Sequence, residues 1–261
     1  MKIPFYQVDA FSTKIFGGNP AAVCFFERWP EDEILQSIAS ENNLSETAFL
    51  VRKSEGLYHL RWFTPKLEVD LCGHATLASV FVIFSFVDNS LSAIDFDTQS
   101  GRLSVARSGT LLSMNFPVRR AHTVEKSPLI AQALGVDPLA VLKSRDLLVV
   151  FNDESTVRDM KPDFDKIKHI PDVFAVIVTA PGQKADFVSR FFAPKAGINE
   201  DPVTGSAHCT LIPYWADRLK KNQLHAYQLS ERGGELFCEN LGDRVRISGS
   251  AALYAKGELY L

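Results

Sequence analysis

The sequence lacks the features that mark several large classes of protein. Its 261 residues contain no GxGxxG, P-loop or GxSxG motif, so neither a nucleotide-binding fold nor a serine hydrolase is predicted. The four cysteines form no CxxC pair and no obvious disulfide framework, and we interpret them as reduced thiols in a cytoplasmic protein. The opening residues, MKIPFYQVDAF, read as a strand and lack the apolar core of a signal peptide.

Long hydrophobic runs and basic runs are also missing. The longest apolar stretch, Leu77–Val87, has 11 residues, whereas a membrane-spanning helix needs about 20. The 28 Lys and Arg residues against 31 Asp and Glu residues give a net charge of −3. Nucleic acids and anionic membranes are therefore not expected as partners. With 46% hydrophobic residues, the chain is ordinary in composition and has room for one large domain or two smaller ones.

A pattern that occurs twice is the main feature present. An Arg-aromatic-Phe-small-Pro-Lys signature at residues 61–66 returns at residues 190–195, 129 positions later. Each copy is followed by a glycine that opens an apolar segment, and these glycines, Gly73 and Gly205, lie 132 positions apart. Because both spacings are about half the chain, we predict a duplicated protein.

Each half is expected to contain many short strands and one strongly apolar helix. A helix that is apolar on all sides must be surrounded, so the simplest architecture wraps the strands of each half around its own helix. We therefore predict an α+β fold of two pseudo-symmetric, β-barrel-like halves, at residues 1–118 and 119–261. The C-terminal strand is a candidate to pack back on the first half. Residues 117–126 are a candidate linker, and Asp137–Pro138 is expected to begin a short helix.

The two expected helix starts are suited to bind an anion. Backbone N–H groups point outward at a helix start, and glycine lets a ligand approach them closely. If the halves face each other, both starts converge on one cleft that favours a carboxylate. Several polar residues near these starts could form an acid/base site: Asp70, Cys72, His74, Asp201, Thr204 and Ser206.

Other interpretations of these residues compete with an acid/base site. The side chains of Asp70, Asp201, Thr204 and Ser206 are also typical of simple helix caps. Glu46, judged by its local sequence alone, is expected to be a solvated carboxylate at a strand end. Cys72-x-His74 and His208-Cys209 could supply metal ligands, but no zinc-type spacing is present, so a metal site is not predicted.

Four motifs in order make the sequence resemble the PhzF family, named for the phenazine biosynthesis isomerase, which shares its fold with diaminopimelate epimerase and proline racemase. The resemblance covers essentially the whole length. The motifs are Gly18-Asn19-Pro20-Ala21-Ala22-Val23, Asn43-Leu44-Ser45-Glu46-Thr47-Ala48-Phe49, Gly73-His74-Ala75-Thr76-Leu77 and Glu200-Asp201-Pro202-Val203-Thr204-Gly205-Ser206-Ala207.

The resemblance implies a cofactor-independent isomerase, usually a homodimer, that acts on a small carboxylate in a cleft between the halves. In PhzF itself, the residue matching Glu46 moves a proton between carbons of dihydro-hydroxyanthranilate. We therefore predict Glu46 as general acid/base, assisted by His74, Asp201 and Ser206. The residues predicted to bind substrate are Asn19, Ser45, Cys72, Gly73, Thr204 and Gly205.

Cys72 departs from the PhzF pattern, which has alanine at this position. The related epimerases and racemases place one of two catalytic cysteines there, but the matching second position in this chain is Thr204. A Cys72-dependent epimerase with a second acid is therefore an alternative. A catalytically silent binding protein of the same fold is another.

Overall fold

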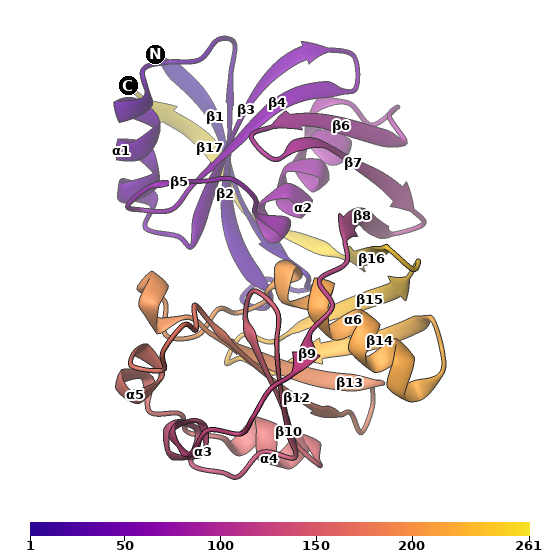
Figure 1. The fold of residues 1–261 in the computed structure, drawn as a ribbon. Helices are drawn as coiled ribbons and strands as arrows, with labels where there is room; N and C mark the ends of the chain where they lie inside the picture. Colours follow the sequence, from indigo (N-terminus) through magenta and orange to yellow (C-terminus); the bar gives the residue numbers. More distant parts are fainter. The chain divides into compact units, whose positions relative to one another are not determined.

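The computed structural model describes residues 1–261, which form two compact units (Figure 1). Unit 1 comprises Met1–Asn115 and Ser248–Leu261, and unit 2 comprises Phe116–Ile247. The chain therefore begins and ends in unit 1. None of the helices combines the length and apolar character needed to cross a membrane.

Unit 1 is built on a mixed sheet in which antiparallel and parallel pairs alternate. The pairs β1–β2, β3–β4 and β6–β7 are antiparallel, whereas β2–β3 and β4–β6 are parallel. Each parallel pair needs a crossover connection, and helices α1 and α2 supply these two. The elements are β1 (Lys2–Ala10), β2 (Asn19–Phe26), α1 (Asp32–Asn42), β3 (Glu46–Ser54), β4 (Leu57–Phe63), β5 (Glu68–Val69), α2 (Gly73–Val82), a π-helical turn (Ile83–Val87), β6 (Ala93–Thr98), β7 (Gly101–Ser108), β8 (Leu111–Pro117) and β17 (Ala251–Tyr260).

Helix α2 is the core of unit 1, because strands surround it on several sides. It packs against β1, β2, β3 and β17. All but two of its residues are buried, including the polar Thr76 and Ser79. Their hydroxyl groups donate to the carbonyls of Cys72 at 2.5 Å and Ala75 at 2.7 Å. Those bonds allow hydroxyl groups to lie inside an apolar core without the cost of an unpaired donor.

Unit 2 has the same alternation of strand pairs. The pairs β10–β11, β12–β13 and β14–β15 are antiparallel, and β11–β12 and β13–β14 are parallel. The elements are β9 (His122–Thr123), α3 (Pro128–Leu134), β10 (Ala140–Lys143), β11 (Leu147–Val150), α4 (Glu154–Asp159), α5 (Phe164–Lys168), β12 (Val176–Pro181), β13 (Phe187–Phe192), a 3₁₀ turn (Pro194–Ala196), α6 (Gly205–Leu219), β14 (Gln223–Gln228), β15 (Gly234–Asn240) and β16 (Arg244–Gly249).

The strand register repeats as well as the strand order. Phe63 pairs with Thr47 in unit 1, and Phe192 pairs with Val176 in unit 2, so both partners are displaced by the same 129 positions. The helices α2 and α6 begin at Gly73 and Gly205. The predicted α+β fold with a central helix opening at each glycine is confirmed.

Helix α6 contains an internal proline whose effect the chain compensates. Pro213 has no N–H group, so the carbonyl of Cys209, four residues earlier, loses its normal helical partner. The backbone N–H of Arg119 donates to that carbonyl at 2.9 Å. A segment predicted to be a linker therefore also completes the hydrogen bonding of the central helix.

Two local predictions differ from the structure. Asp137–Pro138 does not begin a helix, because the residues after it form β10, which pairs with β9 and β11. Pairing with two neighbours outweighs the local capping pattern. The predicted linker also contains the short strand β9.

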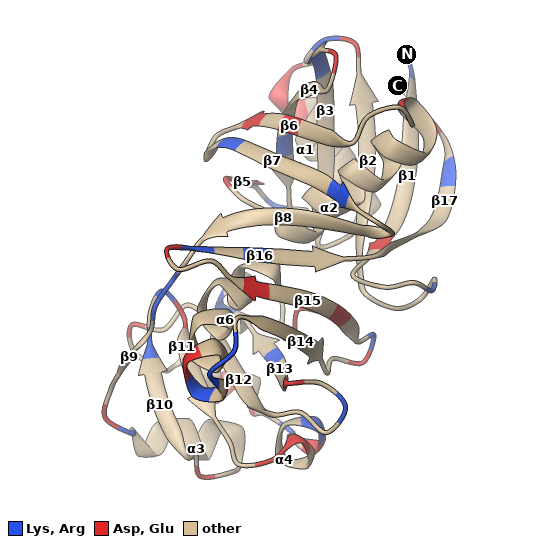
Figure 2. Ribbon diagram, turned by 90° about the vertical axis from the view of Figure 1, so that its right-hand side faces the viewer, with Lys and Arg blue, Asp and Glu red and all other residues tan.

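Charged residues of both signs are spread over the strands and helices of each unit (Figure 2), in keeping with the small net charge.

Candidate active site

Three elements of unit 1 bring four polar side chains together at their starts. Asn19 is the first residue of β2, and Glu46 is the first residue of β3. Cys72 and His74 lie at the start of α2. Because β2 and β3 run parallel, with Ala21 paired to Glu46, both strands begin at the same edge of the sheet. Strand register and the helix start therefore position the cluster.

His74 lies at the centre of this cluster. Its Nε2 is 3.1 Å from Oε2 of Glu46, and its Nδ1 is 3.1 Å from Nδ2 of Asn19. The Cys72 Sγ lies 3.6 Å from Nδ1 and 4.0 Å from Nε2. The side chain of His74 is 6% exposed and that of Glu46 is 16% exposed. Glu46 is thus the member of the pair that a ligand reaches more easily.

The surroundings of His74 favour its charged form. Burial by itself would lower its pKa, but contacts with the Cys72 sulfur and the Glu46 carboxylate outweigh burial and hold the pKa well above 6.5. Burial, together with the charge of Glu46, raises the pKa of the Cys72 thiol. The cluster therefore places a histidine whose charged form is favoured beside a carboxylate and a buried sulfur.

Both central helices begin without a side-chain cap. The N-cap residues are Cys72 for α2 and Thr204 for α6, and neither side chain accepts a capping hydrogen bond. Neither first turn contains an acidic residue. The interpretation of Thr204 as a simple side-chain cap is therefore wrong. Each start keeps the positive end of its helix dipole without a protein carboxylate in its first turn to neutralise it.

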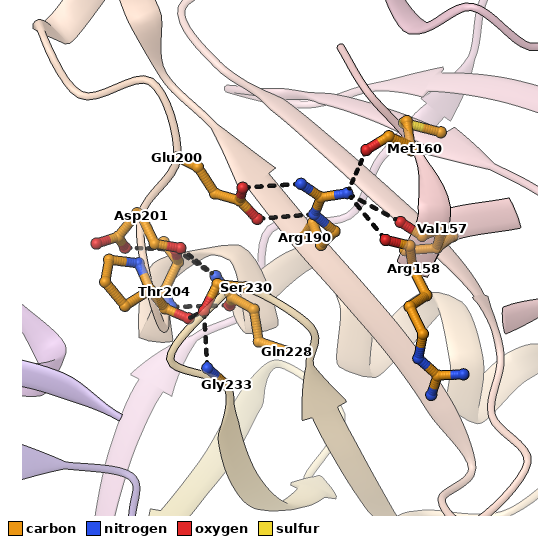
Figure 3. A network of polar contacts seen from close by, with 11 residues as sticks. Val157, Arg158, Met160, Arg190, Glu200, Asp201, Thr204, Gln228, Ser230 and Gly233 are labelled. Atoms are coloured by element: carbon orange, nitrogen blue, oxygen red, sulfur yellow. Dashed lines mark hydrogen bonds and ion pairs between the residues drawn. The ribbon is translucent and has the colours of Figure 1, made fainter. Parts of the chain in front are cut away.

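In unit 2, the segment before α6 is held by Gln228, the last residue of β14 (Figure 3). Its Oε1 accepts the backbone N–H of Thr204 at 2.8 Å, and its Nε2 donates to the carbonyl of Asp201 at 2.8 Å. The hydroxyl of Thr204 donates to Oδ2 of Asp201 at 2.5 Å. Gln228 is 1% exposed, so a buried amide fixes both predicted site residues.

The remaining predicted residues lie at or near the same places in the fold. Ser45 directly precedes Glu46 and is half-buried. Ser206 is the second residue of α6 and is also half-buried. Asp70 is exposed, and its backbone carbonyl accepts the hydroxyl of Ser100 at 2.8 Å. The structure thus brings Asn19, Glu46, Cys72 and His74 into one cluster and places Asp70 outside it.

Arg61 fixes the segment that leads into α2. Its Nε and one terminal nitrogen donate to the two carboxylate oxygens of Glu68, both at 2.7 Å, and its other terminal nitrogen donates to Asp32 at 2.8 Å. The guanidinium also lies over the ring of Phe63, 5.1 Å from its centroid. A two-bond fork of this kind fixes direction as well as distance.

Unit 2 repeats this device (Figure 3). Arg190 donates to both carboxylate oxygens of Glu200, at 2.7 and 2.8 Å, and to the carbonyl of Met160 at 2.8 Å. Its guanidinium lies over the ring of Phe192, 5.0 Å from the centroid. Both glutamates stand five residues before the glycine that opens the following helix. We call the Arg61–Glu68 and Arg190–Glu200 pairs the two clamps.

The clamps and Gln228 were not singled out from the sequence. Arg61 and Arg190 belong to the repeated signature, which indicates the duplication but does not identify their glutamate partners. The available signal was a glutamate at the same distance before each glycine. Gln228 lies 23 residues beyond Gly205 with nothing in its local pattern to connect it with that helix start.

The duplication is not symmetric in its chemistry. Thr47 corresponds to Val176 by strand register, so Glu46 corresponds to Ala175. By the spacing of the glycines, Cys72 corresponds to Thr204 and His74 to Ser206. All three titratable groups of the cluster therefore have counterparts in unit 2 that do not titrate in the ordinary pH range. At these positions, titratable side chains are therefore found in unit 1 alone.

Comparisons with known proteins agree with this architecture. An uncharacterized isomerase of Pseudomonas aeruginosa is 52% identical over 261 residues, with 100% of each chain covered. The crystal structure of a PhzF-family phenazine biosynthesis protein of Enterococcus faecalis matches with a TM-score of 0.98 at 49% identity, again covering 100% of each chain. A hydroxyproline epimerase of Agrobacterium vitis has a TM-score of 0.63 at 8% identity, covering 99% of this chain and 92% of the other.

The epimerase likeness, at so low an identity, shows the shared fold alone. The family assignment comes from sequence, because the model of the phenazine biosynthesis-like proteins, PhzC-PhzF, matches residues 8–257. That match spans all four motifs and both central helices. The chain belongs to the PhzC-PhzF family of phenazine biosynthesis-like proteins.

Proposed function

We propose that this protein is a cofactor-independent isomerase that moves a carbon-bound proton on a small carboxylate substrate, with Glu46 as the general acid/base. Family membership and the isomerase name of its Pseudomonas relative make it an enzyme of the isomerase class. The observation that carries the mechanism is the pair between Glu46 and the buried His74, 3.1 Å apart at the start of α2.

The geometry gives each group a part in such a reaction. Glu46 is the more exposed partner, so its carboxylate is the group that reaches a substrate carbon, takes the proton and returns it to another carbon. Asn19 contacts Nδ1 of His74 and fixes the ring. His74 in turn orients the Glu46 carboxylate and stabilises negative charge that develops on the substrate. The uncapped start of α2 at Gly73 attracts the substrate carboxylate.

A thiol-based epimerase has less support from the same geometry. A thiol acts as a base or nucleophile only as its thiolate, which needs a lowered pKa. Burial raises the pKa of Cys72 instead. The position of a second catalytic cysteine holds Thr204, whose hydroxyl is engaged with Asp201. Cys72 in this proposal only fills the space beside Gly73.

Proton exchange in deuterated water tests the proposal directly. Dihydro-hydroxyanthranilate, which the PhzF resemblance implies, would be assayed by NMR beside a panel of small amino and unsaturated carboxylates. A substrate should gain deuterium at carbon, and Glu46→Gln should lower that rate by about 10² or more while binding survives. Exchange should also survive dialysis against a chelator, because the proposed chemistry uses no metal.

The variant Cys72→Ala separates the two enzymatic mechanisms. If Glu46 carries the proton, this variant loses no more than a few-fold in rate. If the protein is a thiol epimerase, Cys72→Ala should be as damaging as Glu46→Gln, and iodoacetamide should inactivate the parent with protection by substrate. Binding of a carboxylate with no exchange in either the parent or the variants would instead show a binding protein.

A further inference from the structure

The cluster in unit 1 joins three kinds of metal ligand. One ligand atom each from Glu46, Cys72 and His74 lies within 4.8 Å of the others. Cys72 and His74 are adjacent to one helix start, whereas Glu46 comes from the start of a strand far away in sequence. A metal site was not predicted from the sequence, because no zinc-type ligand spacing is present. The fold supplies Glu46 as the third ligand.

The separations within the cluster suit a tetrahedral ion of the size of zinc. At the tetrahedral angle, zinc bonds of about 2.3 Å to sulfur and about 2.1 Å to nitrogen or oxygen place sulfur and nitrogen about 3.6 Å apart, and nitrogen and oxygen about 3.4 Å apart. The Cys72 Sγ lies 4.0 Å from His74 Nε2, and that nitrogen lies 3.1 Å from Glu46 Oε2. Because the sulfur lies nearer to Nδ1, at 3.6 Å, the Cys72 side chain must rotate toward Nε2 for one ion to reach all three ligand atoms.

Asn19 adds the outer support that a metal-bound histidine needs. A ligating histidine normally donates its other ring N–H to an oxygen acceptor, which fixes the ring. His74 Nδ1 faces the Asn19 side-chain amide at 3.1 Å. A turn of the Asn19 amide by 180° exchanges its oxygen and its nitrogen with little change in shape. The same residue therefore serves His74 with the amide turned to present its oxygen.

We propose that Glu46, Cys72 and His74 form a binding site for zinc or a chemically similar divalent cation. Binding displaces the thiol proton of Cys72 and the Nε2 proton of His74 to solvent. Three protein ligands leave a fourth position for water. The ion occupies the atoms that proton transfer needs, so it acts as an inhibitor. This last consequence rests on the proposed function, whereas the binding itself does not.

Cobalt and zinc titrations of the purified full chain test the site without any substrate. Cobalt bound to a thiolate gives a strong sulfur-to-metal charge-transfer absorption in the near ultraviolet. We expect one equivalent of cobalt per chain to produce this band and zinc to displace it. Cys72→Ala should abolish the band and weaken zinc binding by about 100-fold or more, since it removes a direct ligand.

Two further variants make the test specific. Cys209→Ala removes another buried cysteine, on α6 in unit 2, and should leave both titrations unchanged. Glu46→Gln keeps shape and should weaken zinc binding while preserving the cobalt–thiolate band at higher metal concentration. Circular dichroism and thermal unfolding confirm that each variant is folded.

The outcomes separate this proposal from the proposed isomerase activity. The absence of a thiolate–cobalt band in the folded parent, or an equal band in Cys72→Ala, would overturn the metal site and leave the proton-transfer mechanism standing. A band with the expected variant pattern supports the site even when no carboxylate undergoes exchange. With an exchanging substrate, added zinc should stop exchange and a chelator should restore it, and continued exchange at saturating zinc would refute inhibition.

Discussion

Two histidines on the central helices show how neighbours decide the charge of a buried side chain. His74 lies beside the carboxylate of Glu46, and its pKa is held well above 6.5. His208 has no charged partner, and burial lowers its pKa to about 4 although Nδ1 donates to the carbonyl of Thr204 at 2.9 Å. Both residues are buried. The difference therefore comes from the partners and not from depth.

His208 should make the protein sensitive to acid. Its pKa is depressed in the folded state, so the unfolded state binds more protons between about pH 6.5 and pH 4 and stability falls as pH falls through that window. His208→Gln keeps a donor for Thr204 and cannot titrate. Between pH 7 and pH 4, the parent should lose about 2–3 kcal/mol more free energy of unfolding than this variant does.

Urea unfolding at a series of pH values measures this difference. His122→Gln, which changes an exposed histidine, is the matched control and should follow the parent. Parallel stability curves for the parent and His208→Gln would contradict the assignment of a neutral His208.

At the residue level, most residues of the candidate site were predicted from the sequence. Some were predicted from local pattern, and others only from the family resemblance. Local pattern made Glu46 a solvated carboxylate, and only the family resemblance raised it to a catalytic candidate. Its contact with His74 depends on the parallel register of β2 and β3 and on the position of α2, which are long-range features. The proposed metal ligand set depends on the same long-range register.

At the level of secondary-structure elements, each of the two clamps fixes the path of the segment between a strand and the helix that follows. Arg61 joins β4 to β5, and Arg190 joins β13 to the segment before α6. The side chains of all four partners are at most 20% exposed. Loss of one partner would leave a charge partly buried, which costs more than loss of a surface pair.

Replacement of Arg61 should affect both stability and catalysis. Arg61→Met keeps much of the side-chain stem and should lower the free energy of unfolding by about 1–3 kcal/mol, because Glu68 loses its partner. It should also lower kcat more than it raises KM, since the start of α2 positions His74. Arg61→Lys restores the charge without the fork and should recover only part of both losses.

The surface pair Arg102–Asp97 provides the control for this prediction. Its side chains are 55% and 30% exposed, and Arg102→Met should change stability far less than Arg61→Met does. Chemical denaturation and exchange kinetics measure both variants. If Arg61→Met behaved like Arg102→Met in both assays, the clamp would have no positioning role.

Elements were predicted best where the pattern was long and strongly apolar. The helix starts at Gly73 and Gly205 were predicted correctly, because glycine and a change of hydrophobic pattern coincide there. The helix predicted to begin at Asp137–Pro138 was wrong, because the following residues form β10, which is defined by pairing with β9 and β11 and not by local capping. Short pairings of this kind depend on which strands meet, and local propensity does not specify that.

At the scale of the whole molecule, the two ends of the chain meet in unit 1. Strand β17 pairs with β1 from Ala251–Ala10 to Tyr260–Lys2, and Leu259 packs against the cluster around α1. Most side chains of β17 are at least partly exposed. The strand therefore contributes mainly by completing the backbone hydrogen bonds of β1 and by covering one side of α2.

Deletion of residues 251–261 should therefore destabilise one unit selectively. Without β17, strand β1 keeps only β2 as partner, and the lost backbone pairing should lower the stability of unit 1 by about 3 kcal/mol or more. Hydrogen exchange read by mass spectrometry should show lost protection in β1, β2 and α2, while β12, β13 and α6 of unit 2 keep theirs. Tyr260→Ser, which alters a side chain that is 72% exposed and leaves the strand in place, should behave as the parent. Equal loss of protection in unit 2 would show that the two units unfold as one cooperative body. The two compact units would then not be independent in stability.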